Sequence, residues 1–199
     1  MNSQIASPDP FSNALFLVVA LSLAGLVHSA WLHSPHSHRF ASPIDGGKTY
    51  RGQPVFGKNK TWRGLMVMPL AGAFFFAALA ALRDSLPSWY ADGLWHLPVS
   101  TYAWLGLISG LSFMLAELPN SFLKRRLSIP PGGTGQQPML KLLCFVFDRV
   151  DSVLGVLLAL SVCVPMTLYA WLWALIFGAA AHGGFSVLLY VLGVKARPL

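Results

Sequence analysis

Residues 142–164 read LLCFVFDRVDSVLGVLLALSVCV, a stretch that is long enough to cross a bilayer as a helix yet carries charge near its start. About 20 apolar residues suffice to span the hydrocarbon core. Asp148, Arg149 and Asp151 lie within the apolar run, and an ionised group at the centre of a membrane helix costs about 2.5–3.5 kcal/mol. These groups therefore need a partner, either one another or a charged ligand at the membrane surface.

The composition of the whole chain is that of an integral membrane protein. Of its 199 residues 55% are hydrophobic and 11% are charged, whereas soluble domains carry about 25% charged residues. Only helices and closed barrels satisfy the backbone in lipid, and these runs are too continuous for barrel strands. We therefore expect an all-α polytopic membrane helix bundle that forms one domain over residues 1–199. Its transmembrane helices, about five, are predicted at 13–32, 65–82, 99–118, 142–164 and 167–193.

The basic residues are distributed unevenly between the connecting segments. Thirteen of the fourteen lie in segments 33–64 and 119–149 and at the C-terminus, and segment 83–98 holds only Arg83. With five spans these basic segments share one side of the membrane, which the positive-inside rule identifies as the cytoplasm. We expect a multi-pass protein of the cytoplasmic (inner) membrane, with its N-terminus outside and two basic cytoplasmic loops.

Two patterns predict how the spans are arranged. Trp89, Tyr90 and Trp95 lie in the weakly charged connection, where an aromatic belt at the outer membrane interface is expected. Gly106 and Gly110 have the spacing that permits close helix packing. This packing can occur within one chain or between two chains.

Residues 56–64, FGKNKTWRG, gather three cations and two glycines directly before the second span. Glycines let backbone N–H groups approach a ligand, and a helix N-terminus favours anions. Lys and Arg add charge directed at phosphate. The segment suits phosphate binding, and the alternative is a juxtamembrane anchor for anionic lipid headgroups. The spacing is not that of a P-loop.

Residues 117–126, ELPNSFLKRR, form a second basic cluster after the third span. Pro119 predicts a bend, and Asn120 or Ser121 is expected to cap a short helix that follows it. The basic run at 124–126 suits phosphate binding. It is also consistent with a basic collar at the membrane surface.

Asp148 and Asp151 have the spacing of a metal site. At i and i+3 their carboxylates share one helix face, and Mg²⁺ is usually bound by one or two carboxylates together with substrate phosphates. The alternative is structural, with an ion pair to Arg149 or to the basic run at 124–126. Together the three segments predict a cytoplasmic pocket suited to phosphoryl or nucleotidyl transfer to a lipid.

The order of these residues resembles the signature of the CDP-diacylglycerol synthase (phosphatidate cytidylyltransferase) superfamily. The compact size, the five expected spans and the segment GKNKTWRG at 57–64 are more similar to its CDP-archaeol synthase branch. The chain lacks the His-Gly-Gly that precedes Asp-Arg-x-Asp in the diacylglycerol enzymes, a difference that concerns the lipid more than the chemistry. The residues that match the signature are Ser121-x-x-Lys124-Arg125 and Asp148-Arg149-x-Asp151-Ser152.

This resemblance implies transfer of a cytidylyl group from CTP to a lipid phosphate, with release of pyrophosphate. The lipid is either phosphatidic acid or an archaeal-type ether lipid phosphate. CTP and membrane lipids are therefore the expected partners, and nucleic acid is not. The resemblance implies Mg²⁺ on Asp148 and Asp151, with Lys124 and Arg125 completing the catalytic set. The residues expected to bind substrate phosphates are Lys58, Asn59, Lys60, Thr61, Arg63, Asn120 and Ser121.

Two alternative interpretations remain. The chain can be a non-catalytic membrane protein that binds anionic lipids through its basic loops, in which case loss of Asp148 and Asp151 leaves lipid binding intact. His33, His36 and His38 form a small cluster, either as ligands of a transition metal or as part of an interfacial loop without a metal.

Overall fold

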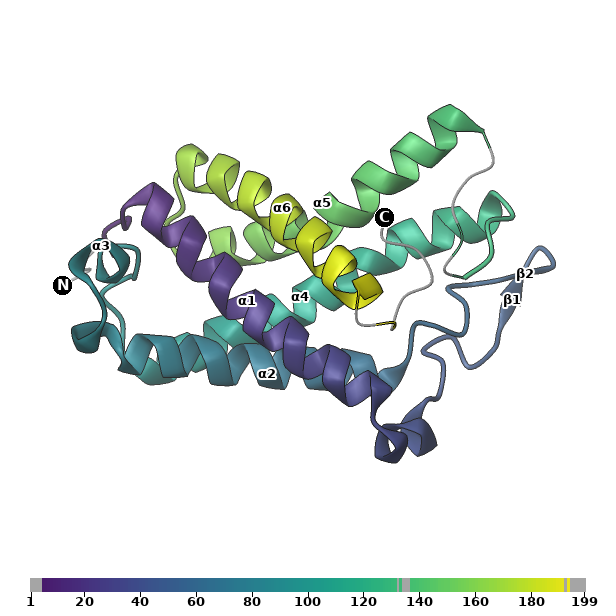
Figure 1. Cartoon of the computed structure of the whole chain (residues 1–199), viewed down its shortest axis with the longest axis horizontal. Helices are drawn as coiled ribbons and strands as arrows, with labels where there is room; N and C mark the ends of the chain where they lie inside the picture. Colours follow the sequence, from purple (N-terminus) through teal and green to yellow (C-terminus); the bar gives the residue numbers. More distant parts are fainter. Residues whose placement is uncertain (1–4, 132, 134–136, 192, 194–199) are drawn as a thin grey trace.

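The computed structural model describes residues 5–131, 133, 137–191 and 193, and most of this part of the chain is helical. Figure 1 shows the long helices side by side, with the β1–β2 hairpin at one end of the bundle and α3 at the other. The end with the hairpin also holds η1 and the end of α4, so the two basic connections lie together. The elements are α1 (Pro10–His33), η1 (Pro35–Phe40), β1 (Thr49–Tyr50), β2 (Gln53–Pro54), α2 (Trp62–Ala81), η2 (Arg83–Ser85), α3 (Ser88–Ala91), α4 (Val99–Arg126), α5 (Pro138–Cys163) and α6 (Leu168–Val191).

In the described part of the chain, five long helices correspond to the five predicted spans, and the prediction of an all-α membrane helix bundle is confirmed. Of the described helices, α1, α2, α4 and α6 are long and apolar enough to cross a membrane. α5 has 26 residues, but Asp148, Arg149 and Asp151 interrupt its apolar stretch. Charged residues in such helices face the bundle interior or a water-filled cavity. The fold therefore has to provide partners for the charged face of α5.

The third span extends further than predicted. α4 runs through Pro119 to Arg126 as one helix, so the prediction that a separate, capped short helix follows Pro119 is wrong. Asn120 and Ser121 lie inside α4 and cap nothing. Membrane helices tolerate proline because neighbouring groups satisfy the carbonyl that it leaves free. The turns after the proline are held by Asn120 and Lys124, which contact α5.

α2 and α4 approach until their backbones touch. A Cβ added to Gly106 would lie 2.2 Å from the carbonyl oxygen of Gly72, and one added to Gly110 would lie 2.5 Å from that of Met68. Small residues four apart permit such an approach. The close packing predicted for Gly106 and Gly110 is thus made within the chain, against α2.

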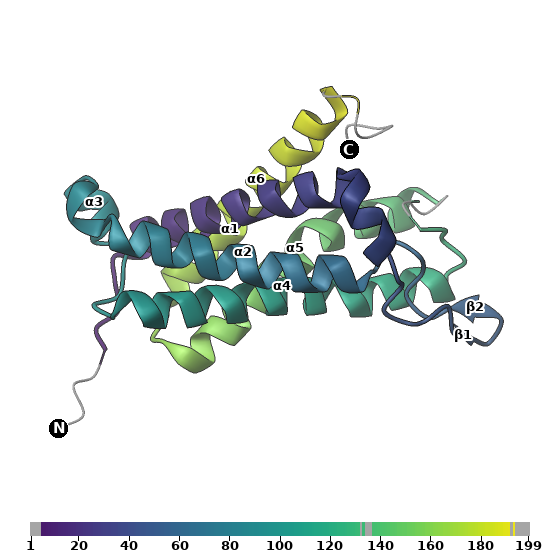
Figure 2. The same cartoon turned by 90° about the horizontal axis from the view of Figure 1, so that it is seen from below.

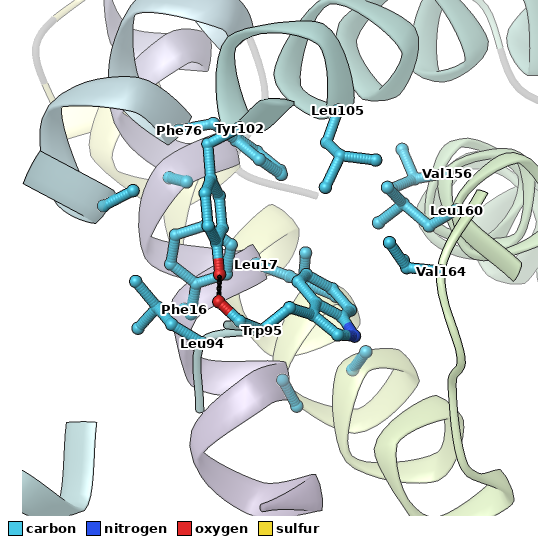
Figure 3. Packing of buried hydrophobic residues seen from close by; sticks show 14 of the residues in the cluster. Phe16, Leu17, Phe76, Leu94, Trp95, Tyr102, Leu105, Val156, Leu160 and Val164 are labelled. Carbon is cyan, nitrogen blue, oxygen red and sulfur yellow. Dashed lines mark hydrogen bonds between the residues drawn. The ribbon is translucent and has the colours of Figure 1, made fainter. Parts of the chain in front are cut away.

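An aromatic cluster closes the end of the bundle that carries α3 (Figure 3). The ring of Phe16 packs edge to face on Phe76 and Tyr102, with centroids 5.0 and 5.6 Å apart. Tyr102 donates its hydroxyl proton to the carbonyl oxygen of Trp95 at 2.8 Å. These contacts join α1, α2 and α4 to the connection that precedes α4.

The predicted aromatic belt is only partly realised. Trp89 is 53% exposed, but Tyr90 and Trp95 are buried at 7% and 0%. Trp95 also donates its indole N–H to the carbonyl oxygen of Pro165 at 3.0 Å. The prediction for Tyr90 and Trp95 is wrong because their segment folds back over the helix ends and places both rings in the core.

Candidate active site

A stripe of polar residues on α4 faces the charged stretch of α5. Glu117, Asn120 and Lys124 recur at i, i+3 and i+7, which places them on one helix face. Asp148 and Asp151 share a face of α5 for the same reason. The two helices pack against each other, so these two faces meet.

Asn120 links the two aspartates. Its Nδ2 donates to Asp148 Oδ1 and to Asp151 Oδ2, each at 2.8 Å. Lys124 forms an ion pair with Asp148, and its Nζ lies 2.6 Å from Oδ2. The side chain of Lys124 is 12% exposed and that of Asp148 is 38% exposed, so the lysine is largely buried while the carboxylate remains accessible to water. The two aspartates therefore face α4, and Asp148 contacts the basic run that ends this helix.

Arg149 takes no part in this network. Its Nη1 donates to the carbonyl oxygen of Phe145 at 2.9 Å, and its guanidinium lies over the ring of the same residue. The structural alternative of an ion pair to Arg149 is therefore not realised in the described structure. Pairing of an aspartate with the basic run at 124–126 is realised, through Lys124 and Asp148.

A third carboxylate, that of Glu117, joins the network although it was not among the predicted site residues. Lys60, from the loop before α2, forms an ion pair with Glu117. The Ser152 hydroxyl lies 3.2 Å from Glu117 Oε1 and 3.1 Å from Asp151 Oδ1, so it can donate to either carboxylate. Glu117 lies three residues before Asn120, so in a continuous helix both residues share one face. The bend expected at Pro119 left this relation out of the prediction.

The residues of this cluster suit a divalent cation. The carboxylates of Asp148, Asp151 and Glu117 meet the ammonium groups of Lys60 and Lys124, which leaves an excess of negative charge. Mg²⁺ prefers such oxygen ligands and keeps several waters or substrate phosphates. Among the described residues no three His, Cys, Asp or Glu side chains converge as a complete metal site.

The loop between η1 and α2 is folded around Asp45. The carboxylate of Asp45 accepts hydrogen bonds from the backbone N–H groups of Gly47 and Phe56 at 2.9 Å and of Gly57 at 3.0 Å. Three donors from two parts of the loop converge on one side chain. Asp45 thereby positions the segment that carries Lys60.

The last turn of α4 holds the same loop from the other side. Arg126 donates to carbonyl oxygens of the β1–β2 hairpin, among them Gln53 at 3.1 Å and Pro54 at 2.5 Å. Arg125 is only 5% exposed, and its Cδ lies 3.8 Å from the position of a Cβ built on Gly57. Its Nη1 is buried without a hydrogen-bond partner among the described residues. Arg126 is therefore an anchor of the loop, and Nη1 of Arg125, like Nε of Arg126, is a buried donor without a partner among the described residues.

The other predicted substrate-binding residues are not gathered at the aspartates. Arg63 donates to the hydroxyl of a serine in η1 at 2.6 Å, and Thr61 is buried at the start of α2. Lys58 and Asn59 are exposed on the loop. Ser121 offers its backbone carbonyl to Arg125, at 3.4 Å. The predicted residues that the structure brings together are Asp148, Asp151, Asn120 and Lys124 by direct contact, and Lys60 through Glu117.

The histidine cluster does not form a metal site in the part of the chain that the structure describes. His33 Nδ1 lies 2.7 Å from the carbonyl oxygen of Ser29, one turn earlier in α1. His36 and His38 follow in η1. The three residues therefore lie at the end of α1 and in η1, where the chain leaves α1.

The hydrogen bonds to Asp45 predict a loop whose stability depends on pH. Burial alone would raise the pKa of this carboxyl, but the backbone donors of Phe56, Gly57 and Gly47 outweigh burial, and the pKa lies below its ordinary value. A lowered pKa gives stability that is fully present above the unfolded value, about 3.9, and is lost as pH falls through the folded value. We expect the Phe56 and Gly57 amides to stay protected from hydrogen exchange above about pH 5. They should lose this protection as the pH falls further and Asp45 becomes protonated.

Asp45→Asn should expose these amides even at neutral pH, because hydrogen bonds to a charged acceptor contribute about 1.5–3 kcal/mol and those to a neutral one less. The measurement is hydrogen exchange at Phe56 and Gly57, corrected for the intrinsic rate at each pH. Asp84→Asn is the matched control, since Asp84 is an exposed carboxylate in the connection at the other end of the bundle. Equal protection in Asp45→Asn and the unaltered protein would contradict this role.

Comparison with known proteins identifies relatives over most of the chain. The family model described as CarS-like, CDP-archaeol synthase, matches residues 39–199. The CDP-archaeol synthase of Pyrococcus furiosus is 31% identical over 163 residues, which cover 79% of this chain and 83% of the relative. That of Halorubrum lacusprofundi is 36% identical over 160 residues, which cover 78% of this chain and 83% of the relative.

A solved structure has the same fold. It is described as an intramembrane enzyme for archaeal membrane lipids biosynthesis, and it matches with a TM-score of 0.53 at 22% identity. The match covers 88% of this chain and 93% of the solved one. Together with the apolar helices, this likeness shows that the chain is a multi-pass membrane protein.

Proposed function

This chain belongs to the CarS-like CDP-archaeol synthase family, and from this membership we propose that it transfers a cytidylyl group from CTP to a membrane lipid phosphate. The products are a CDP-lipid and pyrophosphate. The observation that carries the proposal is the cluster between α4 and α5, where Asp148 and Asp151 share the amide donor of Asn120 beside Lys124.

The proposed reaction is a substitution at the α-phosphorus of CTP. An oxygen of the lipid phosphate forms a new P–O bond, and the bond from the α-phosphorus to the oxygen shared with the β-phosphate breaks. The electron pair of that bond leaves on pyrophosphate. A phosphate monoester with a second pKa of about 6 is largely ionised at neutral pH, so no general base is needed. Catalysis then consists of positioning and of stabilising negative charge.

Asp148 and Asp151 are the residues that would hold Mg²⁺. The ion would neutralise charge on the phosphates of CTP and on the leaving pyrophosphate. Asn120 keeps the two carboxylates side by side. Glu117 adds a third carboxylate next to Asp151, through Ser152.

Lys124, Lys60 and Arg125 are the cations best placed to meet substrate phosphates. Lys124 and Lys60 are each paired with a carboxylate, so each ammonium group can exchange that partner for a phosphate when the substrate arrives. Arg125 has a buried donor that no described residue uses, and a guanidinium binds phosphate with two parallel hydrogen bonds. The further substrate contacts that we propose are Lys58, Asn59, Thr61, Arg63 and Ser121.

We propose that the lipid is an archaeal-type ether lipid phosphate, since the relatives carry the name CDP-archaeol synthase. Phosphatidic acid is the competing substrate. We also infer that the active site faces the cytoplasm and that the N-terminus lies outside. The loop before α2, the end of α4 and the start of α5 lie at one end of the bundle (Figure 1), and basic segments of this kind are retained on the cytoplasmic side.

The test supplies purified protein with labelled CTP, Mg²⁺ and one of the two lipid phosphates. We expect CDP-lipid and pyrophosphate in equal amounts with the ether lipid phosphate, and a lower rate with phosphatidic acid. Chelation of Mg²⁺ should stop turnover, and added Mg²⁺ should restore it. Folded protein that forms no product from either lipid in the presence of Mg²⁺ would contradict the proposal and favour a non-catalytic lipid-binding protein.

A further inference from the structure

A cavity of about 330 Å³ lies where α1 ends and α2 begins, and η1 forms part of its wall. Figure 2 shows η1 between the end of α1 and the start of α2. No residue of the cluster between α4 and α5 lines this cavity, which is therefore separate from the proposed catalytic cluster. Its described lining includes Trp31, Arg39, Phe40, Ser42, Trp62 and Arg63.

The two arginines of the lining have no counter-ion. Neither Arg39 nor Arg63 forms an ion pair with a described residue, and the described lining contains no acidic residue. Asp45 is the only acid between Asp9 and Asp84 in the sequence, and three backbone N–H groups already bind its carboxylate. The described residues therefore leave two positive charges uncompensated at one cavity.

The same lining also holds hydrogen-bond donors that the protein does not use. Arg63 Nη1 donates to Ser37 Oγ at 2.6 Å, and Ser37 is completely buried, so the guanidinium is held at the wall. Arg63 Nε and the indole Nε1 of Trp31 are buried without a partner among the described residues, although buried polar atoms nearly always have one. Arginine binds phosphate with two parallel hydrogen bonds, and a phosphate bound here would lie next to both side chains.

The surroundings of the cavity favour a membrane lipid as the source of the phosphate. An exposed apolar stripe with a four-residue spacing runs along α2 from the cavity, and it consists of Trp62, Met66, Leu70 and Phe74. Tryptophan is enriched where a membrane meets water, and Trp31 and Trp62 both line the cavity. A lipid can bind the arginines through its phosphate and lay its chains along the stripe, whereas a nucleotide or free phosphate would use the arginines alone.

We propose that this cavity is a binding site for an anionic membrane phospholipid, whose phosphate lies between Arg39 and Arg63 and whose chains lie along the stripe on α2. The bound lipid supplies the missing negative charge and joins η1 to the ends of α1 and α2. Such a lipid is a phosphodiester, so it differs from the phosphate monoester proposed as the substrate. The site therefore does not depend on the proposed reaction.

The test measures thermal stabilisation of the purified protein in a neutral detergent as phosphatidylglycerol is added, without CTP or Mg²⁺. A ligand that binds only the folded protein raises its stability with concentration. Phosphatidylcholine with the same chains is the control for the charge of the headgroup. Inorganic phosphate tests whether the anion binds without its chains.

Two pairs of variants test the site itself. Arg39→Gln removes one charge, and Arg51→Gln is its matched control, because Arg51 is also exposed, also lies over the ring of its neighbour in the sequence, and does not line the cavity. Ser42→Asp adds a negative charge to the wall of the cavity, and Ser42→Asn adds a side chain of the same size without charge. Arg63 is left unchanged, because it is also among the proposed substrate contacts.

We expect phosphatidylglycerol to stabilise the unaltered protein at concentrations at which phosphatidylcholine and inorganic phosphate do not. Arg39→Gln and Ser42→Asp should each weaken the apparent affinity for phosphatidylglycerol about tenfold or more, because each disrupts hydrogen bonding between charged groups. Arg51→Gln and Ser42→Asn should stay within about twofold of the unaltered protein, since exposed charges outside a site contribute little. Added CTP and Mg²⁺ should not displace the lipid.

Absence of stabilisation by phosphatidylglycerol, or equal stabilisation by phosphatidylcholine or by inorganic phosphate, would overturn the proposal. Equal weakening in Arg39→Gln and Arg51→Gln would also overturn it, because the lipid would then respond to the basic surface as a whole. Displacement by CTP and Mg²⁺ would place the lipid at the catalytic cluster instead. If Arg39→Gln does not fold, the Ser42 pair decides: weaker binding in Ser42→Asp alone supports the site, and equal binding in both variants overturns it.

Discussion

Asp151→Asn is expected to lower turnover by about 10²–10³-fold, the usual effect of removing one preorganised electrostatic group from an active site. The asparagine keeps the size of the side chain and an oxygen that can accept from Asn120 or Ser152. What it removes is the negative charge that would hold Mg²⁺ against the phosphates. The protein should therefore stay folded while the reaction fails.

The measurement is the rate of CDP-lipid formation as a function of Mg²⁺ concentration. In Asp151→Asn the concentration of Mg²⁺ that gives half of the maximal rate should rise, which a merely structural role would not produce. Asp84→Asn removes an exposed carboxylate at the other end of the bundle and should leave both quantities unchanged. Near-normal turnover with an unchanged Mg²⁺ requirement in Asp151→Asn would exclude this residue as a metal ligand.

Gly106→Leu is expected to destabilise the folded protein by about 3 kcal/mol or more, at the upper end of the cost of overpacking. A Cβ at this position would lie 2.2 Å from the carbonyl oxygen of Gly72 and 2.8 Å from Phe76 Cβ. Backbone atoms of two helices cannot rotate away as a flexible side chain can. α2 and α4 would have to separate, and the aromatic cluster that includes Phe76 would lose contacts.

Thermal unfolding of the purified protein, followed by circular dichroism, measures this effect. Gly184→Leu is the matched control, because it adds the same side chain to a helical glycine with open space around it. A melting temperature for Gly106→Leu equal to that of Gly184→Leu would show that α2 and α4 are not in backbone contact.

The sequence predicted which candidate-site residues share one face of a helix. It did not predict which helix faces contact each other. The spacing of Asp148 and Asp151 placed both carboxylates on one face of α5, and the structure turns that face toward α4. Glu117 is not among the predicted site residues, because the predicted bend at Pro119 separates it from Asn120 and Lys124. Continuation of α4 aligns Glu117 with Asn120 and Lys124, and its pairing with Lys60 depends on a loop far away in the sequence.

The contacts of the basic residues were likewise not predictable from the sequence. Lys60, Arg63 and Arg125 were predicted to hold phosphates, and Arg126 belongs to the same basic run as Arg125; the structure gives each of the four a different position. Arg126 binds hairpin carbonyls, and Arg63 binds a serine of η1. Arg125 is 5% exposed, and no side chain or carbonyl among the described residues accepts a hydrogen bond from its Nη1. Charge and spacing alone do not distinguish these positions, because all four side chains are long and have the same sign.

The amino-acid sequence by itself determined that the chain is a multi-pass membrane protein built of long apolar helices and that its basic residues gather in a few segments. Those properties follow from apolar length and from the helical period, which act within a segment. Only the tertiary structure decided which helix faces meet and that Glu117 joins the aspartates. The physical reason is that glycines on α2 and α4 set how closely those helices approach, and contacts between residues far apart in the sequence exist only once the helices are packed.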